Sequence, residues 1–406
     1  MKRSQKEDGA KNRDNVADRF AGQKVKVFVV AGEASGDKLG AAAMAGLKSL
    51  VDVEFRGVGG VRMAEEGLSS QFPMSELSLM GIAEILPKYF HLKRRIREVA
   101  RAILEWQPDV VLTIDSPDFC LRVADLVKAE SDIRICHYVA PTVWAWRPER
   151  AAKMAKRVDQ VLALFPFEPP YFEKVGLRCD FVGHPVVTEE LASFDAVMTF
   201  RDTYDLINKP IVLILPGSRK GEVSRLAPIF GEALGIFART HPDAGYWLAV
   251  APGLEDHVRE AIKDWPVEVE LFTDPLSKTV AFRGVDVALA ASGTVSLELA
   301  ANDTAMVIAY RMNWLTEQIV KRKLLVDTVT LVNLVSETRV VPEFLGPNCV
   351  PQKIAASLSH VVNTLGHDQR AAMKLTMKRL GRGQDAPGLR AARAVLEGIA
   401  EAKAAE

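Results

Sequence analysis

Short apolar segments, each followed by a polar turn and a helix-forming segment, recur along this chain. The clearest case spans residues 285–300, where the apolar run Val285–Ala290 precedes the turn Ser292-Gly293-Thr294 and the start of a helix. Similar apolar runs occupy residues 25–30, 53–60, 109–114, 133–139, 159–164, 179–183, 210–215, 246–250, 267–272 and 305–310. This alternation is typical of parallel sheets with helices on both faces, so the sequence predicts an α/β protein.

The chain is too long for one hydrophobic core. A single core rarely grows beyond about 250–300 residues, and this chain has 406. The apolar periodicity weakens over residues 186–209, which indicates a hinge. We therefore predict two doubly wound, Rossmann-like domains, 23–187 and 188–365, that face one another across a cleft. Residues 1–22 are predicted to be a disordered tail, and residues 366–406 to form helices that pack on the first domain or on a partner.

Charge and cysteine usage exclude several classes of protein. The 52 basic and 52 acidic residues balance, so a broad nucleic-acid-binding surface is not expected. No apolar run approaches the roughly 20 residues of a membrane span, and the polar first 22 residues lack the apolar centre of a secretory signal. A cytoplasmic location is expected. The cysteines are far apart and form no CxxC pair, which predicts buried thiols rather than disulfides or a zinc site: Cys120, Cys136, Cys179 and Cys349.

Two turns in the second half of the chain have the composition of anion sites. At Ser292-Gly293-Thr294 a strand leads into a helix, and backbone N–H groups at a helix N-terminus attract anions. Glu298, one turn later, is placed to accept hydrogen bonds from sugar hydroxyls. The alternative is an ordinary connection in which Ser292 or Thr294 caps the helix. In the turn PGSRKGE, Arg219 is suited to pair with a phosphate; the alternative is that Arg219 and Lys220 are surface charges of a loop.

Polar side chains also follow two predicted strands in the first half. Glu33, Ser35 and Asp37 come after the first strand, and Asp115 and Asp118 come after the strand at 109–114. The spacing matches neither a GxGxxG fingerprint nor a P-loop. A partly buried carboxylate can act as a general base towards a hydroxyl, and Pro117 is expected to keep both aspartates on a loop. Alternatively, Asp37 and Asp118 only cap helices.

An apolar and basic stretch covers residues 75–101. Its composition suits shallow insertion at an anionic membrane surface, but a core helix with a solvated basic face is equally compatible. The expected membrane contacts are Met80, Ile82, Ile85, Leu86, Tyr89, Phe90, Lys93, Arg94 and Arg97. Further along, Trp144, Trp146 and Arg147 are expected in a loop, where exposed tryptophans stack on sugars or pack an interface. His184, next to a proline, is expected to be structural.

Several motifs, in unbroken order over residues 25–351, together resemble the lipid-A-disaccharide synthase family. They are AGEASGD (31–37), SLMGIAEILP (78–87), IDSPDF (114–119), HYVAPTVWAWR (137–147), FPFE (165–168), GHP (183–185), LPGSRKGE (215–222), ASGTVSLE (291–298) and PEFL (342–345). The family usually has proline where Val332 stands and leucine where Phe165 stands. The first departure concerns the backbone beside the donor site.

The resemblance implies an inverting glycosyltransferase of the GT-B type that needs neither a metal nor a cofactor. It implies transfer from UDP-2,3-diacylglucosamine to 2,3-diacylglucosamine 1-phosphate through a β-1,6 bond, at the inner membrane of a Gram-negative bacterium. The roles that it implies are the base for Asp115, acceptor contacts for Glu33 and Ser35, and a donor contact for Asn333. UDP would be held by Arg219, Ser292, Gly293, Thr294 and Glu298. The basic apolar stretch would then contact the inner-membrane surface.

The same residues allow two alternative functions and leave the oligomeric state open. A non-hydrolysing UDP-N-acetylglucosamine epimerase would share the nucleotide site but has no use for a membrane patch. A catalytically silent lipid-binding protein would keep the patch but would need neither Asp115 nor Arg219. The C-terminal helices also allow a homodimer.

Overall fold

The computed structural model describes residues 16–77, 82–312, 324–364 and 366–405, with only the backbone for residues 82–89 and 405. The chain forms two compact units. The first contains the chain up to Pro185 together with the residues from Gly383 onward, and the second is Val186–Arg382. The last part of the chain therefore returns to the first unit.

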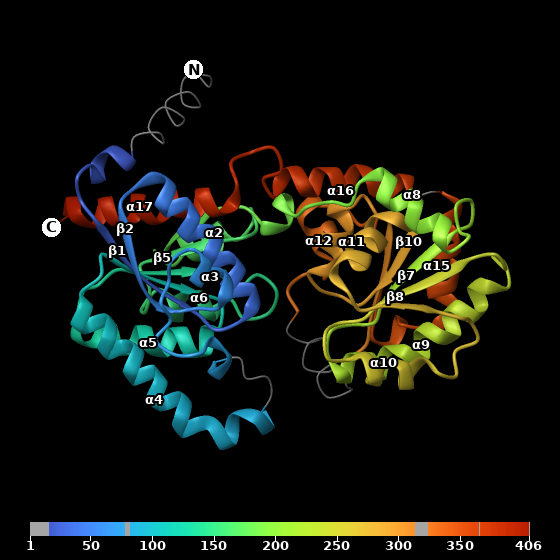
Figure 1. Ribbon diagram of the computed structural model, residues 1–406, viewed down its shortest axis with the longest axis horizontal. Coiled ribbons are helices and arrows are strands. Elements are labelled where there is room, and N and C mark those ends of the chain that lie inside the picture. Colours follow the sequence, from blue (N-terminus) through green and yellow to red (C-terminus); the bar gives the residue numbers. More distant parts are fainter. Residues whose placement is uncertain (1–15, 78–81, 313–323, 365, 406) are drawn as a thin grey trace. The chain divides into compact units, whose positions relative to one another are not determined.

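The first unit is built on a six-stranded parallel sheet with the order β2-β1-β3-β4-β5-β6. Helices α2 and α17 cover one face of this sheet, and α4 and α5 pack together on the other (Figure 1). The elements are η1 (Ala17–Phe20), β1 (Val25–Ala31), α2 (Ala34–Leu50), β2 (Val53–Val58), α3 (Val61–Glu65), η2 (Met74–Glu76), α4 (Ile82–Trp106), β3 (Val110–Ile114), α5 (Pro117–Glu130), β4 (Ile135–Tyr138), α6 (Glu149–Met154), β5 (Gln160–Ala163), α7 (Pro169–Glu173), β6 (Arg178–Phe181) and α17 (Pro387–Ala405).

The second unit repeats this architecture with the sheet order β12-β11-β10-β7-β8-β9, again all parallel. Helices α9, α10 and α15 enclose one core, and α8, α11, α12 and α16 lie on the opposite side of the sheet. The elements are η3 (Pro185–Thr188), α8 (Phe194–Thr203), β7 (Ile211–Leu215), α9 (Lys220–Ala238), β8 (Gly245–Ala249), α10 (Glu255–Ile262), β9 (Glu270–Phe272), α11 (Pro275–Gly284), β10 (Val287–Ala290), α12 (Val295–Ala301), β11 (Met306–Tyr310), α14 (Leu331–Ser336), β12 (Glu343–Leu345), η4 (Gly346–Asn348), α15 (Pro351–Asn363) and α16 (His367–Arg379).

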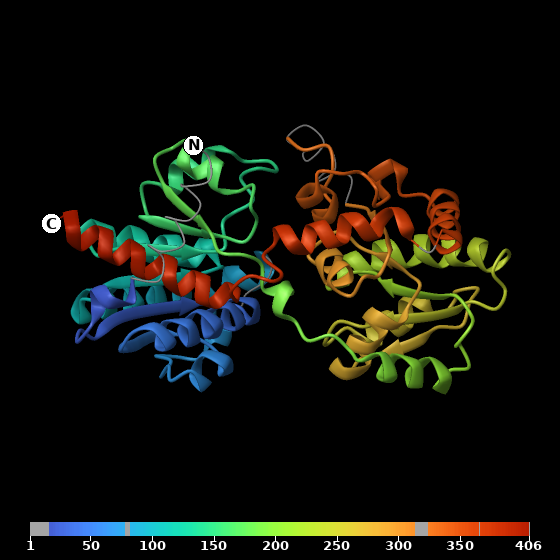
Figure 2. The same ribbon diagram turned by 90° about the horizontal axis from the view of Figure 1, so that it is seen from above.

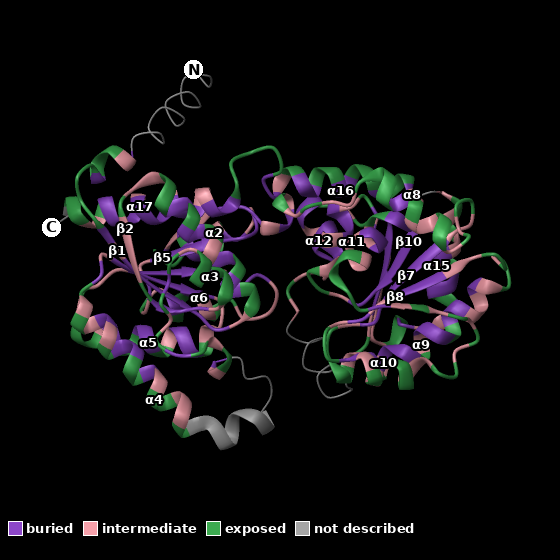
Figure 3. Cartoon of the chain, in the orientation of Figure 1, coloured by how far each residue is buried: buried purple, intermediate pink, exposed green. Residues whose placement is uncertain are grey.

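The central strands are buried along their whole length, as continuous apolar runs require. Every residue of β3 and of β7 is buried, because helices cover both faces of each sheet (Figure 3). The prediction of an α/β protein with two doubly wound, Rossmann-like domains is confirmed. Strand β12 was not predicted: it has three residues, too few for a clear periodicity.

Helix α17 packs closely on α2 because both helices carry small residues where they meet (Figure 2). A Cβ atom added at Gly46 would lie 2.7 Å from the carbonyl oxygen of Gly388 and 3.0 Å from the Cβ atom of Ala392. Gln160 of β5 fixes the same helix from the sheet, donating a hydrogen bond of 2.8 Å to the carbonyl of Ala394. The last helix is therefore an integral part of the first unit.

Two expectations about local structure are wrong. The part of the predicted tail that the structure describes, residues 16–22, contains the 3-10 helix η1, whose Phe20 is only 3% exposed. Residues 1–15 lie outside the described part of the chain. Pro117 does not keep Asp118 on a loop: it is the first residue of α5, a position at which proline is well tolerated, and Asp118 lies in the first helical turn.

Within the described residues, no helix is both long enough and apolar enough to cross a bilayer.

Candidate active site

The candidate site residues gather where the order of the strands reverses in each sheet. In the first unit β1 lies between β2 and β3, so the chain leaves β1 in one direction and returns on its other side. In the second unit β7 lies in the same way between β8 and β10. Open α/β sheets bind ligands at the carboxyl ends of the strands beside such a switch point. The turns after β1, β3, β7 and β10 therefore form two candidate sites, one in each unit.

Asp115 and Ser35 meet at the switch point of the first sheet. The last residues of β1 and β3, Ala31 and Ile114, are paired in register, which brings the two following turns together. The hydroxyl of Ser35 donates a hydrogen bond of 3.2 Å to Oδ2 of Asp115. The backbone N–H of Ser116 donates one of 2.9 Å to Oδ1. Both carboxylate oxygens are thus oriented, and each retains acceptor capacity.

The backbone is strained at this edge. Asp115 and Ser116 have φ values of 54° and 43°, and Val139, at the end of the neighbouring β4, has φ 82°. A β-branched residue with positive φ is an outlier, and such strain persists only where surrounding contacts enforce it. The N–H of Asp115 donates a hydrogen bond of 3.0 Å to the carbonyl oxygen of Tyr138. The N–H of Val139 donates one of 3.1 Å to the carbonyl oxygen of Leu162. These contacts hold the turn in a fixed shape.

Two other acidic residues of the first unit take different positions. Asp37 is 5% exposed and its carboxylate accepts hydrogen bonds from the backbone N–H groups of Gly60, Arg62 and Met63, at 2.8 to 3.1 Å. It caps α3 rather than its own helix. Glu33 occupies the N-cap position of α2, next to Ser35, without a side-chain capping bond. Asp37 is therefore a structural residue, whereas Glu33 directly precedes α2, the helix that carries Ser35 in its first turn.

Trp144 is not exposed, contrary to expectation. It is 7% exposed, and its indole N–H donates 3.3 Å to Oε1 of Glu168. The backbone N–H groups of Leu164 and Phe165 donate 3.1 and 3.0 Å to Oε2 of the same carboxyl. Burial nevertheless raises the pKa of Glu168 to about 7, against these hydrogen bonds that favour the ionised form. Glu168 thus ties the loop after β5 to the loop that carries Trp144.

His184 and Trp146 complete this edge of the first unit. His184 is buried, which lowers its pKa to about 4, and its ring lies 5.6 Å from that of Phe165. The ring of Trp146 is covered by the guanidinium of Arg147 at 4.0 Å. Since a buried neutral histidine neither titrates near neutral pH nor carries a charge, the structural assignment of His184 fits its surroundings.

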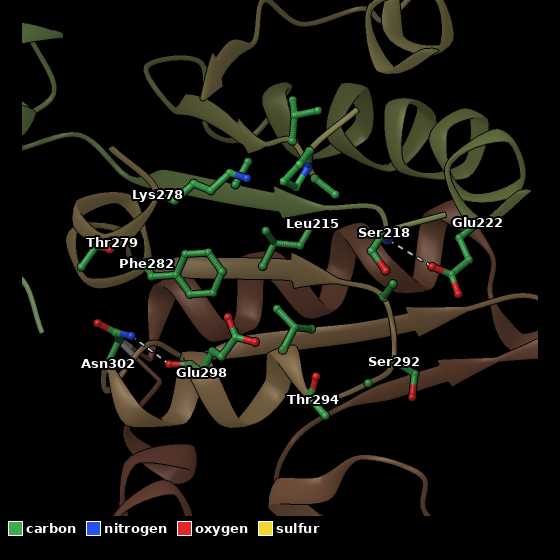
Figure 4. Close-up of a pocket in the computed structure, with 18 of the residues that line it drawn as sticks. Leu215, Ser218, Glu222, Lys278, Thr279, Phe282, Ser292, Thr294, Glu298 and Asn302 are labelled. Carbon is green, nitrogen blue, oxygen red and sulfur yellow. Dashed lines mark hydrogen bonds between the residues drawn. The ribbon is translucent and has the colours of Figure 1, made fainter. Parts of the chain in front are cut away.

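A pocket of about 520 Å³ lies at the switch point of the second unit (Figure 4). Its walls come from the turns after β7 and β10 and from α11 and α12. The lining residues include Gly217, Ser218, Arg219, Glu222, Pro252, Lys278, Thr279, Phe282, Ser292, Gly293, Thr294, Glu298 and Asn302. All the residues predicted to bind UDP therefore line one cavity.

The turn after β10 presents backbone groups and one carboxylate to this pocket. Thr294 is the N-cap residue of α12, but its side chain makes no capping hydrogen bond. Glu298 lies in the first turn of α12, and Figure 4 shows its side chain directed into the pocket. Asn302 donates 2.9 Å from Nδ2 to the carbonyl oxygen of Glu298, which leaves the carboxylate out of this contact.

Asn333 is positioned differently from the other predicted site residues. It is 1% exposed, and its side-chain amide links α14 to the chain before β12. Its Nδ2 donates a hydrogen bond of 2.9 Å to the carbonyl oxygen of Val341, and its Oδ1 accepts one of 3.0 Å from the N–H of the same residue. It does not line the pocket. Its direct contact with a donor stays a prediction that the observed hydrogen bonds do not favour.

The sequence reasoning missed Glu222, Lys278, Phe282 and Asn302 as pocket residues. Figure 4 shows Lys278 and Glu298 on different walls of the pocket. Burial lowers the pKa of Lys278, whereas Glu255, Asp274 and Glu298 act in the opposite direction. The one available signal was the position of Lys278 shortly after the apolar run that ends at Phe272, since residues beyond a strand end approach the switch point.

Residues 82–101 of the apolar and basic stretch lie in the long helix α4. Phe90 is 81% exposed, and Lys93, Arg94 and Arg97 are also exposed. Met80 lies outside the described residues, and for Ile82, Ile85, Leu86 and Tyr89 only the backbone is described. Arg95, on another side of the helix, pairs with Glu76 at 2.8 Å and lies over the ring of Phe72. The exposed residues of the described part of α4 therefore include more basic than acidic side chains, since Glu98 and Glu105 are exposed among the arginines, and one exposed aromatic ring.

All four cysteines are buried and unpaired, as predicted. Among the described residues, no group of histidine, cysteine and acidic side chains is arranged to hold a metal ion.

Comparison with known proteins assigns the family. Residues 27–393 match the family described as lipid-A-disaccharide synthetase. The chain is 59% identical over 387 residues to the lipid-A-disaccharide synthase of Ruegeria pomeroyi, covering 93% of this chain and 96% of that one. It is 45% identical over 379 residues to the corresponding enzyme of Rhodospirillum centenum, covering 92% and 94%.

Solved structures share the fold at low sequence identity. A UDP-GlcNAc 2-epimerase from Neisseria meningitidis bound to UDP-GlcNAc has a TM-score of 0.60 at 13% identity, covering 93% of this chain and all of that one. MurG of Acinetobacter baumannii has a TM-score of 0.52 at 13% identity, covering 93% and 99%. The fold is thus the two-domain, Rossmann-like GT-B type. Together with the sequence matches, this shows that the chain belongs to the lipid-A-disaccharide synthase family of glycosyltransferases.

Proposed function

We propose that this enzyme of lipid A biosynthesis transfers 2,3-diacylglucosamine from UDP to the 6-hydroxyl of 2,3-diacylglucosamine 1-phosphate. The hydroxyl oxygen forms a β-1,6 bond to the sugar's anomeric carbon, while the bond from that carbon to the pyrophosphate oxygen breaks. The electron pair leaves with UDP, and the hydroxyl proton goes to a base. Attack from the face opposite the leaving group inverts the anomeric configuration.

The observation that carries the proposal is the Asp115 carboxylate at the first switch point. Its two oxygens are held by Ser35 and by the backbone of Ser116, so the group is oriented before a substrate arrives. Each oxygen can still accept a proton, and a positioned carboxylate of this kind accelerates proton transfer by about 10²–10⁴-fold. In this proposal Asp115 is the base, and Glu33 and Ser35 contact the acceptor.

The pocket of the second unit is the proposed donor site. Backbone N–H groups of the Ser292-Gly293-Thr294 turn and the guanidinium of Arg219 stabilise the charge that develops on the departing pyrophosphate. Glu298 accepts hydrogen bonds from the ribose hydroxyls. No step in this scheme requires a metal or another cofactor.

Helix α4 is the proposed contact with the inner-membrane surface, at which a peripheral enzyme meets its acylated substrates. The exposed Phe90 and the exposed cations Lys93, Arg94 and Arg97 match an interface that is apolar within and anionic at its surface. Met80, Ile82, Ile85, Leu86 and Tyr89 belong to the same proposed contact.

The test is the release of UDP from UDP-2,3-diacylglucosamine by the purified chain, with and without 2,3-diacylglucosamine 1-phosphate. Acceptor-dependent release, with a disaccharide product, is expected. Epimerisation of UDP-N-acetylglucosamine without any lipid acceptor would instead indicate the epimerase reaction. Binding to anionic vesicles without UDP release under any of these conditions would indicate a lipid-binding protein.

A further inference from the structure

Glu222 places a carboxylate in the same pocket that is proposed to bind a pyrophosphate. It lies in the first turn of α9, lines the pocket, and has a side chain that is 12% exposed. Its Oε2 accepts 3.1 Å from the N–H of Ser218, and its Oε1 lies 3.4 Å from Nη1 of Arg219. The carboxylate therefore contacts the backbone of the loop after β7, as Figure 4 shows for Ser218, and also the guanidinium of Arg219.

The loop is closely fitted to this side chain. A Cβ atom added at Gly217 would lie 2.6 Å from Oε2 and 2.7 Å from Cβ of Glu222, and Gly217 has φ 111°. Only glycine both lacks a Cβ atom that would clash here and adopts a positive φ without strain. The loop is therefore packed directly against the carboxylate of Glu222.

Tyr310 fixes the carboxylate from the other side. At the end of β11, its hydroxyl donates 3.1 Å to Oε1 of Glu222. Burial and the charge of Glu222 raise the pKa of Tyr310, so this hydroxyl remains a donor at neutral pH. Glu222 is thus restrained by Ser218 and Tyr310 and cannot follow Arg219 freely.

Arg219 is held much more loosely than its partner. Its side chain is 68% exposed and meets Glu222 at a long 3.4 Å. Exposed ion pairs of this kind contribute only about 0–1 kcal/mol, so the guanidinium can exchange one anionic partner for another. A pyrophosphate bound beside the loop would offer it a second, more highly charged partner.

We propose that Glu222 is a positioning residue that competes with the pyrophosphate of UDP for Arg219 and thereby promotes release of the nucleotide product. This inference rests on the proposed function, because it takes the ligand of the pocket to be a nucleoside diphosphate. When the donor binds, Arg219 turns from Glu222 to the pyrophosphate. After transfer, the fixed carboxylate recaptures the guanidinium and repels the UDP left behind.

The test is calorimetric titration of the full chain with UDP, comparing wild type with Glu222→Gln. The glutamine keeps the size and a hydrogen-bond acceptor but removes the charge, so UDP should bind about five- to tenfold more tightly, and less so at high salt. The inhibition constant of UDP as a product should fall by the same factor. Glu232→Gln, on an exposed part of α9 where Glu232 contacts Gln352, is the control and should not change either constant.

If the wild type binds UDP but Glu222→Gln binds it no more tightly, Glu222 only supports the loop. That result would overturn this inference and leave the proposed function intact. A wild-type chain that does not bind UDP would overturn the proposed function as well. If Glu222→Gln does not fold, Tyr310→Phe replaces it. This variant keeps the charge but frees the carboxylate to follow Arg219, so UDP should bind about two- to fivefold more weakly, and unchanged binding would overturn the inference.

Discussion

Replacing Glu298 by alanine should weaken UDP binding by removing the proposed ribose contact. Glu298 lies in the first turn of α12, and its side chain is directed into the pocket, opposite the wall that carries Lys278. Its backbone oxygen is already engaged by Asn302. The substitution therefore removes a pocket carboxylate without disturbing that helix contact.

The expected loss follows from the kind of hydrogen bond that is removed. A hydrogen bond to a charged group contributes about 1.5–3 kcal/mol, which corresponds to a roughly ten- to 150-fold higher dissociation constant for UDP. Glu298→Gln retains one acceptor oxygen but loses the charge, so the increase in its dissociation constant for UDP should lie at the lower end of this range. The helix itself should persist, because alanine is a strong helix former.

Calorimetry with UDP, inorganic pyrophosphate and the lipid acceptor separates this role from a general disturbance. UDP binding should weaken, whereas pyrophosphate and acceptor binding should stay within twofold of wild type. Glu260→Ala is the matched control, because this exposed carboxylate pairs only with the neighbouring Lys263 in the described contacts. Equal losses for UDP and the acceptor, or for UDP and pyrophosphate, would refute the ribose contact.

Three further changes test other parts of the account. Ser35→Ala removes the 3.2 Å hydrogen bond to Asp115, so kcat should fall about tenfold while UDP affinity is unchanged. The pKa of Glu168, raised by burial to about 7, means that the folded protein keeps a proton that the unfolded chain loses above about pH 4.5. Its stabilising contribution is complete below pH 4.5 and lost as pH rises through 7. Between pH 5 and pH 8, the free energy of unfolding measured with urea should therefore fall by about 2.5 kcal/mol more in the wild type than in Glu168→Gln. Gly388→Val forces a side chain against the backbone carbonyl of Ala42. The free energy of unfolding measured with urea should therefore fall by about 1–3 kcal/mol.

The strands and their turns were predictable because burial on both faces leaves a simple signal. Each apolar run ends where its strand leaves the sheet, so Asp115, Arg219 and Glu298 could be found as polar residues just beyond such ends. Arg219 and Glu298 lie in one pocket because the parallel strands β7 and β10 bring their carboxyl ends to one edge of the second sheet, whereas Asp115 lies at the switch point of the first sheet. The resemblance to a known family then indicated the reaction, which periodicity cannot indicate.

The remaining features depend on contacts between distant segments, which periodicity cannot show. Lys278 comes from a helix after β9, and its place in the pocket follows from the position of β10 beside β7. Asp37 caps α3, a helix that begins more than 20 residues later, rather than its own helix. Trp144 is buried by its contact with Glu168, although its sequence neighbours suggest an exposed loop. In each case the partner is remote in sequence, so the local pattern carries no information about it.

The central claim is that Asp115 takes the proton of the acceptor hydroxyl, and Asp115→Asn tests it most directly. Asparagine keeps the shape and the contact with Ser35 but cannot accept that proton. Initial rates of UDP release from the diacylated donor, in the presence of the lipid acceptor, should fall by about 10²–10⁴-fold, with UDP affinity and vesicle binding within twofold of wild type. A variant that releases UDP at the wild-type rate would contradict the account.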